Sequence, residues 1–221
     1  MEDILKNIEI CIETGKIDKN SPFPPDKKGQ DGADELTKQA LESGISPEDI
    51  LEKACVPGME AVGNKFSRNE IFVPQLLLSA KAMTGAMNHL KPYFLSGSVQ
   101  RKGTFVIGTV QGDLHDIGKN IVAMIIEGGG WEVIDLGVDV KPEKFISTVE
   151  ENPGSAVGLS SLLTTTMRNM ETIVNELKNK YSDIHVLIGG APVTQDFCNS
   201  IGASFYSPDP QGAVNYLKNV S

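Results

Sequence analysis

Hydrophobic positions in the first ~95 residues recur every three or four residues, which is the period of an amphipathic helix. This period predicts helices over residues 2–14, 32–43, 47–65 and 74–94. Residues 15–31 interrupt it with proline, glycine and charge, which indicates an irregular loop. Four helices in a segment of this length indicate a small helical bundle.

The pattern changes after residues 96–103, a small, polar and basic segment that we interpret as a linker. Short β-branched runs then alternate with helical segments. Strands are expected at 104–110, 132–136, 156–159, 184–188 and 203–206, and helices at 117–129, 142–151, 167–180, 194–201 and 209–219. Strict alternation predicts a parallel sheet with helices on both faces. Five such units fit the doubly wound strand order 2-1-3-4-5 of flavodoxin-like folds.

The expected organisation is therefore α/β in class. A helical domain at residues 1–95 and the linker at 96–103 precede a doubly wound five-stranded domain at 104–221. A length of 221 residues accommodates one large domain or two small ones, which agrees with this division.

Charge and composition exclude several classes of partner. The chain carries 20 Lys and Arg against 29 Asp and Glu, a net charge of −9, so it repels phosphate backbones and nucleic acid is not expected as a partner. It has no apolar run of about 18 residues, so no membrane partner is expected. The N-terminus lacks the cationic end and apolar core of a signal peptide. Three widely spaced cysteines form neither a disulfide framework nor a CxxC site, which indicates the cytoplasm.

Three unusual segments follow strands that the predicted order makes neighbours. Residues 111–120 (QGDLHDIGKN) follow the first strand, residues 160–166 (SSLLTTT) the third and residues 189–192 (GGAP) the fourth. Open parallel sheets bind ligands beyond the carboxyl ends of their strands, near the point where the strand order reverses. We therefore expect the three segments to line one continuous rim.

Asp113 and His115 have the spacing of a metal ligand and its orienting carboxylate. The carboxylate can accept the proton of one ring nitrogen and leave the other nitrogen free to bind metal. The alternative is a helix N-cap, Asp113 or Asp116, beside an incidental exposed histidine. A single histidine does not hold a bare zinc ion, which needs three or four protein ligands. If His115 binds metal, a cofactor must supply the remaining ligands, which points to a macrocycle.

The other two segments each have two interpretations. Gly189 and Gly190 either form a tight turn or allow close approach of the backbone to a bulky ligand. Residues 164–166 are three threonines that could simply cap the helix that follows.

The joint spacing of these residues is more specific. Asp113-x-His115-x-x-Gly118, Ser160-x-Leu162 and Gly189-Gly190 together resemble the cobalamin-binding signature DxHxxG–SxL–GG. The surrounding GDLHDIGKNIV and VIDLGVDV are similar as well. In the N-terminal half, VPGMEAVGNKF and EIFVPQLLLSAKAM look like the helical cap that precedes the cobalamin domain of methionine synthase and of corrinoid proteins. The resemblance spans residues 32 to 215, and LLTTTM and GGAPVTQDF are most similar to the stand-alone corrinoid proteins of anaerobic methyltransferase systems.

The resemblance implies a cofactor, cobalamin or a related corrinoid, and a role for each matching residue. His115 would be the lower axial ligand of cobalt in place of the cofactor's own dimethylbenzimidazole. Asp113 would bond the other ring nitrogen, and the relay would continue to Thr166, where the family has a serine. The implied cofactor-binding set is Asp113, His115, Asp116, Ile117, Gly118, Ser160, Leu162, Thr164, Thr166, Gly189, Gly190, Phe66 and Val73.

Phe66 and Val73 belong to the implied cap. By resemblance they would cover the upper face of the cobalt, with Val73 in place of a leucine that is common there. Their apolar character alone favours a place in the core of the bundle.

The implied function is that of a methyl carrier in one-carbon metabolism. A bound corrinoid would cycle between Co(I) and methyl-Co(III), with Co(II) as a further state, and a reductive activator would be one of the partners. The methyl group would pass from a substrate-specific methyltransferase to an acceptor methyltransferase. The chain has no room for a barrel domain that would bind donor or acceptor, so we expect a subunit and not an enzyme on its own. Methylamines, methanol, betaines and methoxylated aromatics all stay open as donors.

Two other cobalamin-binding classes are possible. A cobalamin-dependent sensor would share this pair of domains, but such regulators carry a DNA-binding helix-turn-helix ahead of them. Only about 31 residues precede the cap here, without a basic recognition helix. The cobalamin subunit of a carbon-skeleton mutase lacks this cap, so VPGMEAVGNKF argues against that class.

Overall fold

The computed structural model describes residues 2–97 and 99–220. These residues form two compact units. One contains the chain up to Arg101 together with Gly128–Gly130, and the other contains Lys102–Glu127 and the chain from Trp131 on. The main division falls inside the segment interpreted above as a linker.

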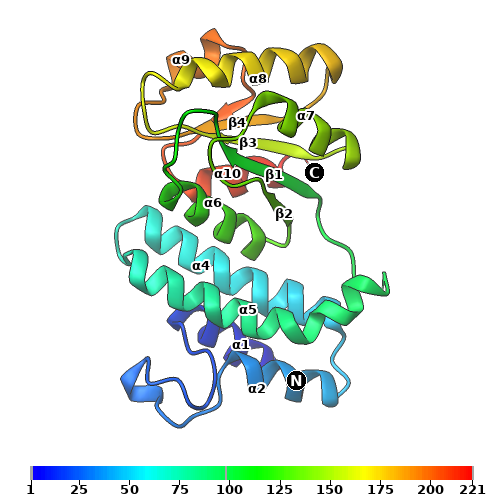
Figure 1. Ribbon diagram of the computed structural model, residues 1–221. Coiled ribbons are helices and arrows are strands. Elements are labelled where there is room, and N and C mark those ends of the chain that lie inside the picture. The colour runs from blue at the N-terminus through cyan, green and yellow to red at the C-terminus, as the bar shows by residue number, and fades with distance from the viewer. Residues whose placement is uncertain (1, 98, 221) are drawn as a thin grey trace. The chain divides into compact units, whose positions relative to one another are not determined.

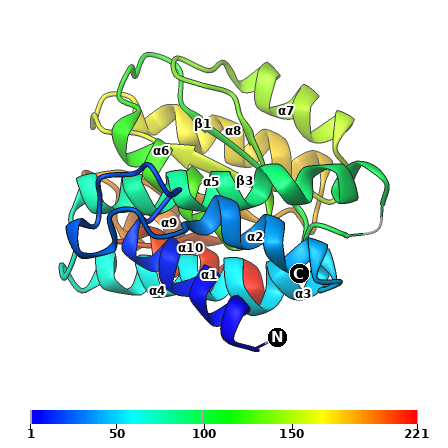
Figure 2. The same cartoon turned by 90° about the horizontal axis from the view of Figure 1, so that it is seen from below.

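The first unit is a helical bundle, as the hydrophobic period predicts. Its four longer helices are α1 (Glu2–Thr14), α2 (Ala33–Glu42), α4 (Val56–Ser67) and α5 (Val73–Leu95). Figure 2 shows these helices from below. Fully buried side chains from each of them form the core, among them Ile8, Ile12, Ala40, Met59, Val62, Leu76 and Leu90. Residues 15–31 form a loop with one short 3-10 turn, η1 (Pro25–Lys27).

The single helix predicted over residues 47–65 is interrupted in the structure. It consists of α3 (Pro47–Ile50), a π-helical turn η2 (Leu51–Cys55) and the start of α4. Pro57 has no amide proton and therefore cannot continue the α-helical ladder at its position. The Val56 amide instead bonds the carbonyl of Leu51, five residues earlier, which is the geometry of a π turn.

The second unit contains a parallel sheet of five strands in the order β2-β1-β3-β4-β5, which confirms the predicted doubly wound topology. The strands are β1 (Thr104–Thr109), β2 (Glu132–Asp135), β3 (Ala156–Ser160), β4 (Val186–Gly189) and β5 (Phe205–Tyr206). The helices that connect and follow them are α6 (Ile117–Gly128), α7 (Pro142–Glu151), α8 (Met167–Lys180), α9 (Gln195–Ser200) and α10 (Pro210–Lys218).

Helices cover both faces of this sheet (Figure 1). The helices α7, α8 and α9 pack on one face, where Phe145, Met170, Ile173, Leu177 and Cys198 join the buried valines of the strands in one apolar cluster. The helices α6 and α10 lie against the other face. Among the described residues, no helix combines the length and apolarity needed to cross a membrane.

Candidate functional site

The three segments singled out in the sequence begin side by side at one edge of the sheet. Thr109 of β1 pairs in register with Ser160 of β3, which in turn pairs with Gly189 of β4. Because the strands are parallel, the loops that follow these residues leave the sheet on the same edge. The predicted rim is therefore present.

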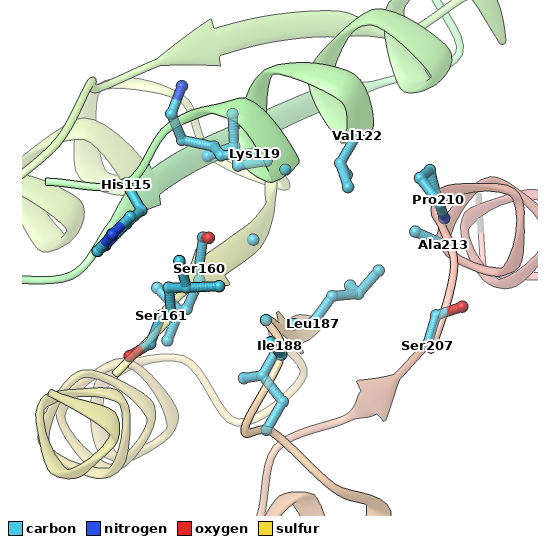
Figure 3. Close-up of a pocket in the computed structure, with 18 of the residues that line it drawn as sticks. His115, Lys119, Val122, Ser160, Ser161, Leu187, Ile188, Ser207, Pro210 and Ala213 are labelled. Carbon is cyan, nitrogen blue, oxygen red and sulfur yellow. The ribbon is translucent and has the colours of Figure 1, made fainter. Parts of the chain in front are cut away.

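A cavity of about 630 Å³ opens at this edge. Its walls are formed by residues 114–119, 158–162, 187–191 and 206–210, together with Phe105, Ile107, Val122 and Ala213. Figure 3 shows His115 at one side of the cavity and Val122 and Pro210 at the other, with Leu187 and Ile188 between them.

The cavity brings together eight of the residues expected to bind a cofactor. They are His115, Asp116, Ile117, Gly118, Ser160, Leu162, Gly189 and Gly190. Asp113 and Thr166 are buried and contact each other beneath this surface. Thr164 is exposed and is not among the residues that line the cavity. Phe66, in the last turn of α4, and Val73, the first residue of α5, belong to the helical unit, and both are partly exposed.

Asp113 fixes the orientation of the His115 ring. The Asp113 carboxylate is fully buried, whereas 54% of the His115 side chain is exposed. One carboxylate oxygen, Oδ1, lies 2.7 Å from His115 Nδ1 and accepts a second bond from the His115 amide at 3.1 Å. An ionised carboxylate can only accept, so this contact assigns the ring proton to Nδ1. His115 Nε2 consequently keeps its lone pair for a ligand.

The second carboxylate oxygen, Oδ2, is held by the loop after β3. It accepts bonds from the amides of Leu162 at 2.7 Å and Leu163 at 3.3 Å, and from the Thr166 hydroxyl at 3.0 Å. Burial by itself raises the pKa of Asp113, but the donors from Leu162, His115 and Thr166 outweigh it and hold the pKa well below its usual range. At neutral pH, Asp113 is therefore an anion behind the imidazole.

Thr166 occupies the N-cap position of α8, but its side chain makes no capping bond to the helix. Its hydroxyl instead reaches Asp113 and the carbonyl of Leu163. This contact joins the loop after β1 to the loop after β3.

Three further side chains hold the loop that carries His115, and the sequence analysis missed all of them. Thr109 donates to the carbonyl of His115 at 2.8 Å, Asn169 donates to the carbonyl of Gln111 at 2.7 Å, and Asp139 accepts from the amide of Gly112 at 2.7 Å. In this role Asp139 has a left-handed backbone conformation, with φ 54°, which is uncommon for residues other than glycine. The partners of Asp139 and Asn169 lie 27 and 58 residues away, so no local pattern identifies them.

The wall after β5 was also missed, although one signal was available. Tyr206, Ser207 and Pro210 line the cavity on the side away from His115. Asp209 caps α10 by accepting from the Gly212 amide at 3.0 Å, and Pro210 follows at the first helical position. An Asp-Pro pair after the last predicted strand marks a helix start at this same edge.

The two neighbouring glycines have different surroundings. Gly190 has φ +135°, and a Cβ there would lie 1.7 Å from the Ser161 carbonyl oxygen, so the protein's own backbone requires glycine. At Gly189, as at Gly118, a Cβ would meet no atom within 4 Å. Packing of the protein does not require glycine at these two cavity-lining positions, and both leave open space in the cavity.

The donor set fits a metal that brings most of its ligands with it. The described residues contain no group of three or more His, Cys, Asp or Glu side chains that could hold a metal ion. His115 instead presents one free nitrogen, flanked by the apolar side chains of Leu114 and Ile117, which are 72% and 70% exposed. Exposed apolar surface around a single imidazole suits the flat face of a macrocycle.

Comparison with known proteins gives concordant matches. Two family profiles, both described as a B12 binding domain, match residues 103–206 and 29–91. The trimethylamine corrinoid protein of Methanosarcina barkeri is 40% identical over 190 residues, which are 84% of this chain and 88% of the relative.

Two solved structures are similar to the chain. A cobalamin-binding protein of Desulfitobacterium hafniense has a TM-score of 0.72 and 31% identity, covering 85% of this chain and 90% of that one. A chain of the methanol:cobalamin methyltransferase complex of Methanosarcina barkeri has a TM-score of 0.81 and 28% identity, covering 99% of this chain and 79% of that one.

Proposed function

The chain belongs to the family of B12-binding corrinoid proteins, and from that premise we propose that it carries a methyl group on the cobalt of a bound corrinoid between two methyltransferases. The observation that carries the proposal is the Asp113–His115 pair at the edge of the cavity. A bound corrinoid supplies the cobalt to which the methyl group is attached, and the protein tunes the axial ligand and controls access.

His115 is the proposed lower axial ligand. The Asp113 carboxylate holds the proton on Nδ1, which leaves Nε2 as the coordinating atom and makes the imidazole a stronger donor. Thr166 and the Leu162 amide keep that carboxylate in place. The imidazole thereby replaces the benzimidazole of the cofactor, whose nucleotide tail then needs a separate site.

The cavity is the proposed site for that tail. Gly118 and Gly189 leave space at its walls, and Ser160 supplies a hydroxyl beside them. Leu187, Ile188 and Val122 provide apolar surface for an aromatic base. Small residues and apolar side chains together make room for the bulky base of the tail.

The proposed partners are separate methyltransferases. One named relative is a trimethylamine corrinoid protein, which supports a methylamine as donor. One similar structure comes from a methanol:cobalamin methyltransferase complex, which supports a donor-specific methyltransferase as partner. We extend the proposal to an acceptor methyltransferase and a reductive activator, since a carrier must unload its methyl group and recover from oxidation. The three buried free thiols fit a reducing compartment, so the cytoplasm is the proposed location.

The helical unit is the proposed cap over the upper face of the cobalt, with Phe66 and Val73 as its contact residues. Phe66→Ala should speed photolysis of the methylated cofactor under equal illumination and matched occupancy, because an apolar shield is removed. Leu77→Ala is a matched control on an exposed residue of α5. If Phe66→Ala and Val73→Ala both photolyse like the unchanged protein, neither residue covers the cobalt.

An anaerobic transfer assay tests the proposed function directly. The chain is loaded with cobalamin, reduced, and mixed with a purified trimethylamine, dimethylamine, monomethylamine or methanol methyltransferase and its substrate. We expect the spectrum of the methylated corrinoid to develop with a methylamine donor, and to be lost from the protein when an acceptor methyltransferase is added. Absence of methylation with every donor, while free methylcobalamin is formed normally by the same enzymes, would contradict the carrier role.

A further inference from the structure

Two buried hydroxyls, not one, stand behind the Asp113 carboxylate. Ser161, the residue after β3, is fully buried, and Thr166 is 7% exposed. Their oxygens lie 2.7 Å apart, which is the shortest contact either hydroxyl makes. Thr166 Oγ1 is 3.0 Å from Asp113 Oδ2, whereas Ser161 Oγ is 3.4 Å from the same oxygen. Both hydroxyls also lie within reach of the Leu163 carbonyl.

Counting protons leaves one favoured arrangement for this pair. Each hydroxyl has a single proton to donate. If both hydroxyls donated elsewhere, the 2.7 Å contact between their oxygens would contain no proton and would be repulsive. If Thr166 donated to Ser161, the only hydroxyl donor left to Asp113 would be Ser161, at the longer distance. The arrangement that satisfies the short contact and the anion together is Ser161 donating to Thr166, and Thr166 donating to Asp113.

The Leu163 carbonyl, which both hydroxyls can reach, does not need either of these protons. It already accepts the amides of Thr166 at 3.1 Å and Met167 at 3.2 Å, in the first turn of α8. In the ordered chain Ser161 to Thr166 to Asp113, the Leu163 carbonyl, the Thr166 hydroxyl oxygen and the Asp113 carboxylate each have a donor. Donation into the Thr166 oxygen polarises its O–H bond and strengthens its donation to the carboxylate.

The backbone around Ser161 fixes it in this place. The Ser161 amide donates to the carbonyl of Gly189 at 3.1 Å, and the Ser161 carbonyl packs against Gly190, where a Cβ would lie 1.7 Å away. Neither end of the residue can move far without disturbing the loop after β4. The serine hydroxyl is thus preorganised toward Thr166, at a position where an alanine would keep the same backbone.

We propose that Ser161 is a positioning residue that acts through Thr166 on Asp113, and so sets how strongly the His115 imidazole donates to cobalt. The proposal rests on the proposed corrinoid-binding function. A carboxylate that receives a strong hydroxyl donor is a weaker acceptor for His115 Nδ1–H, which makes the imidazole a weaker electron donor. Ser161 then favours the reduced cofactor, in which cobalt releases its axial ligand.

A double-mutant cycle tests this chain of action. Ser161→Ala and Thr166→Val remove the two hydroxyls with little change of volume, and Thr165→Val makes the same change at an exposed threonine of the loop. The Co(II)/Co(I) midpoint potential of each cobalamin-loaded protein is measured by mediated titration. We expect Ser161→Ala to shift the potential to more negative values, Thr166→Val to shift it further, and Thr165→Val to leave it unchanged. In the Thr166→Val background, Ser161→Ala should have no further effect.

A second readout does not depend on the cofactor. In the apo protein, nitrogen-15 and proton resonances of the His115 ring report the Nδ1–H tautomer and the strength of its bond to Asp113. Ser161→Ala should keep the tautomer and move the Nδ1 proton downfield, as Thr166→Val should do more strongly. An unchanged resonance together with an unchanged potential would overturn the proposal, as would equal Ser161→Ala shifts in both backgrounds. If cobalamin binds without histidine coordination, the proposed function fails, while the apo resonances still decide whether Ser161 acts on Asp113.

Discussion

Two glycines inside the sheet and two glycines at its carboxyl edge have opposite surroundings. A Cβ on Gly158, within β3, would lie 2.5 Å from Phe105, and a Cβ on Gly108, within β1, would lie 2.7 Å from Phe145. A Cβ on Gly118 or Gly189 would meet no atom within 4 Å. Inside the sheet, glycine makes room for an aromatic side chain of the same protein. At these two edge positions, no side chain of the described residues fills the space.

Buried polar groups follow the same division between interior and edge. The cluster between the sheet and α7, α8 and α9 is built from apolar side chains. At the carboxyl edge, by contrast, a carboxylate and two hydroxyls are buried together in Asp113, Ser161 and Thr166. Burying a charge costs free energy unless donors surround it, and Asp113 has them. The edge is thus ordered by buried polar contacts, whereas the interior is ordered by apolar packing.

The largest expected effect separates two adjacent glycines at the edge. Gly190→Ala should lower the free energy of unfolding by roughly 3 kcal/mol, because its Cβ would overlap the Ser161 carbonyl in a left-handed backbone. Gly189→Ala should leave stability within about 0.5 kcal/mol of the unchanged protein. Urea unfolding of both apo proteins measures the difference. Equal destabilisation of the two would mean that edge glycines are packed like those of the interior.

The acid stability of the apo protein should reveal the buried carboxylate. The folded-state pKa of Asp113 lies well below the unfolded value of about 3.9, so its ionised form stabilises the fold above that pH. This contribution, on the order of 2 kcal/mol, is lost as the pH falls through the folded pKa. About 1 kcal/mol of it should disappear between about pH 5 and about pH 3. The Asp113→Asn protein should not show this part of the loss of stability in acid. Parallel pH profiles of the free energy of unfolding for the two proteins would contradict the assignment.

The same substitution should change the loaded protein. With Asp113→Asn the imidazole loses its anionic partner and becomes a weaker ligand, which favours Co(I), where cobalt gives up axial ligands. A loss of outer-shell support typically costs 10–100-fold in metal affinity, or on the order of 60–120 mV for a one-electron couple. The Co(II)/Co(I) midpoint potential should therefore become less negative. An unchanged or more negative potential would count against the relay.

A smaller effect tests whether the open space at the edge is used. Gly189→Val adds a branched side chain that strands accept well, so the stability of the apo protein should not fall. The side chain would occupy the cavity, and we expect cobalamin to bind about tenfold more weakly, or about 1.4 kcal/mol. Fluorescence or absorbance titration of the apo protein measures the affinity. Unchanged affinity would show that the tail lies elsewhere.

Most of the fold was predictable because its signals are local. Alternation of β-branched runs with helical periods identified the strands and helices of the sheet unit. Five such units fit the doubly wound order β2-β1-β3-β4-β5, which the sheet has. The π turn at Leu51–Cys55 was not predicted, because the amphipathic pattern of residues 47–65 continues across Pro57 and hides the interruption that this proline causes.

The candidate site was predictable only in part. Asp113, His115 and the glycines stand in short segments whose spacing is visible in the chain. Other site residues act through contacts that form only when the chain folds. These are Ser161, Asp139 and Asn169, whose partners lie 5, 27 and 58 positions away along the sequence. Ser161 is the middle residue of the Ser160-x-Leu162 motif, and no local pattern distinguishes it from a serine at any other buried strand end. The network behind the imidazole therefore needed the structure.

The identity of the lower axial ligand is the central claim, and electron paramagnetic resonance of the Co(II) protein tests it most directly. The protein is produced with nitrogen-15 histidine and loaded with unlabelled cobalamin. We predict superhyperfine coupling from a nitrogen-15 nucleus, and its loss in His115→Ala, whereas His185→Ala should retain it. Coupling from the unlabelled nitrogen of the cofactor's own benzimidazole would contradict the account.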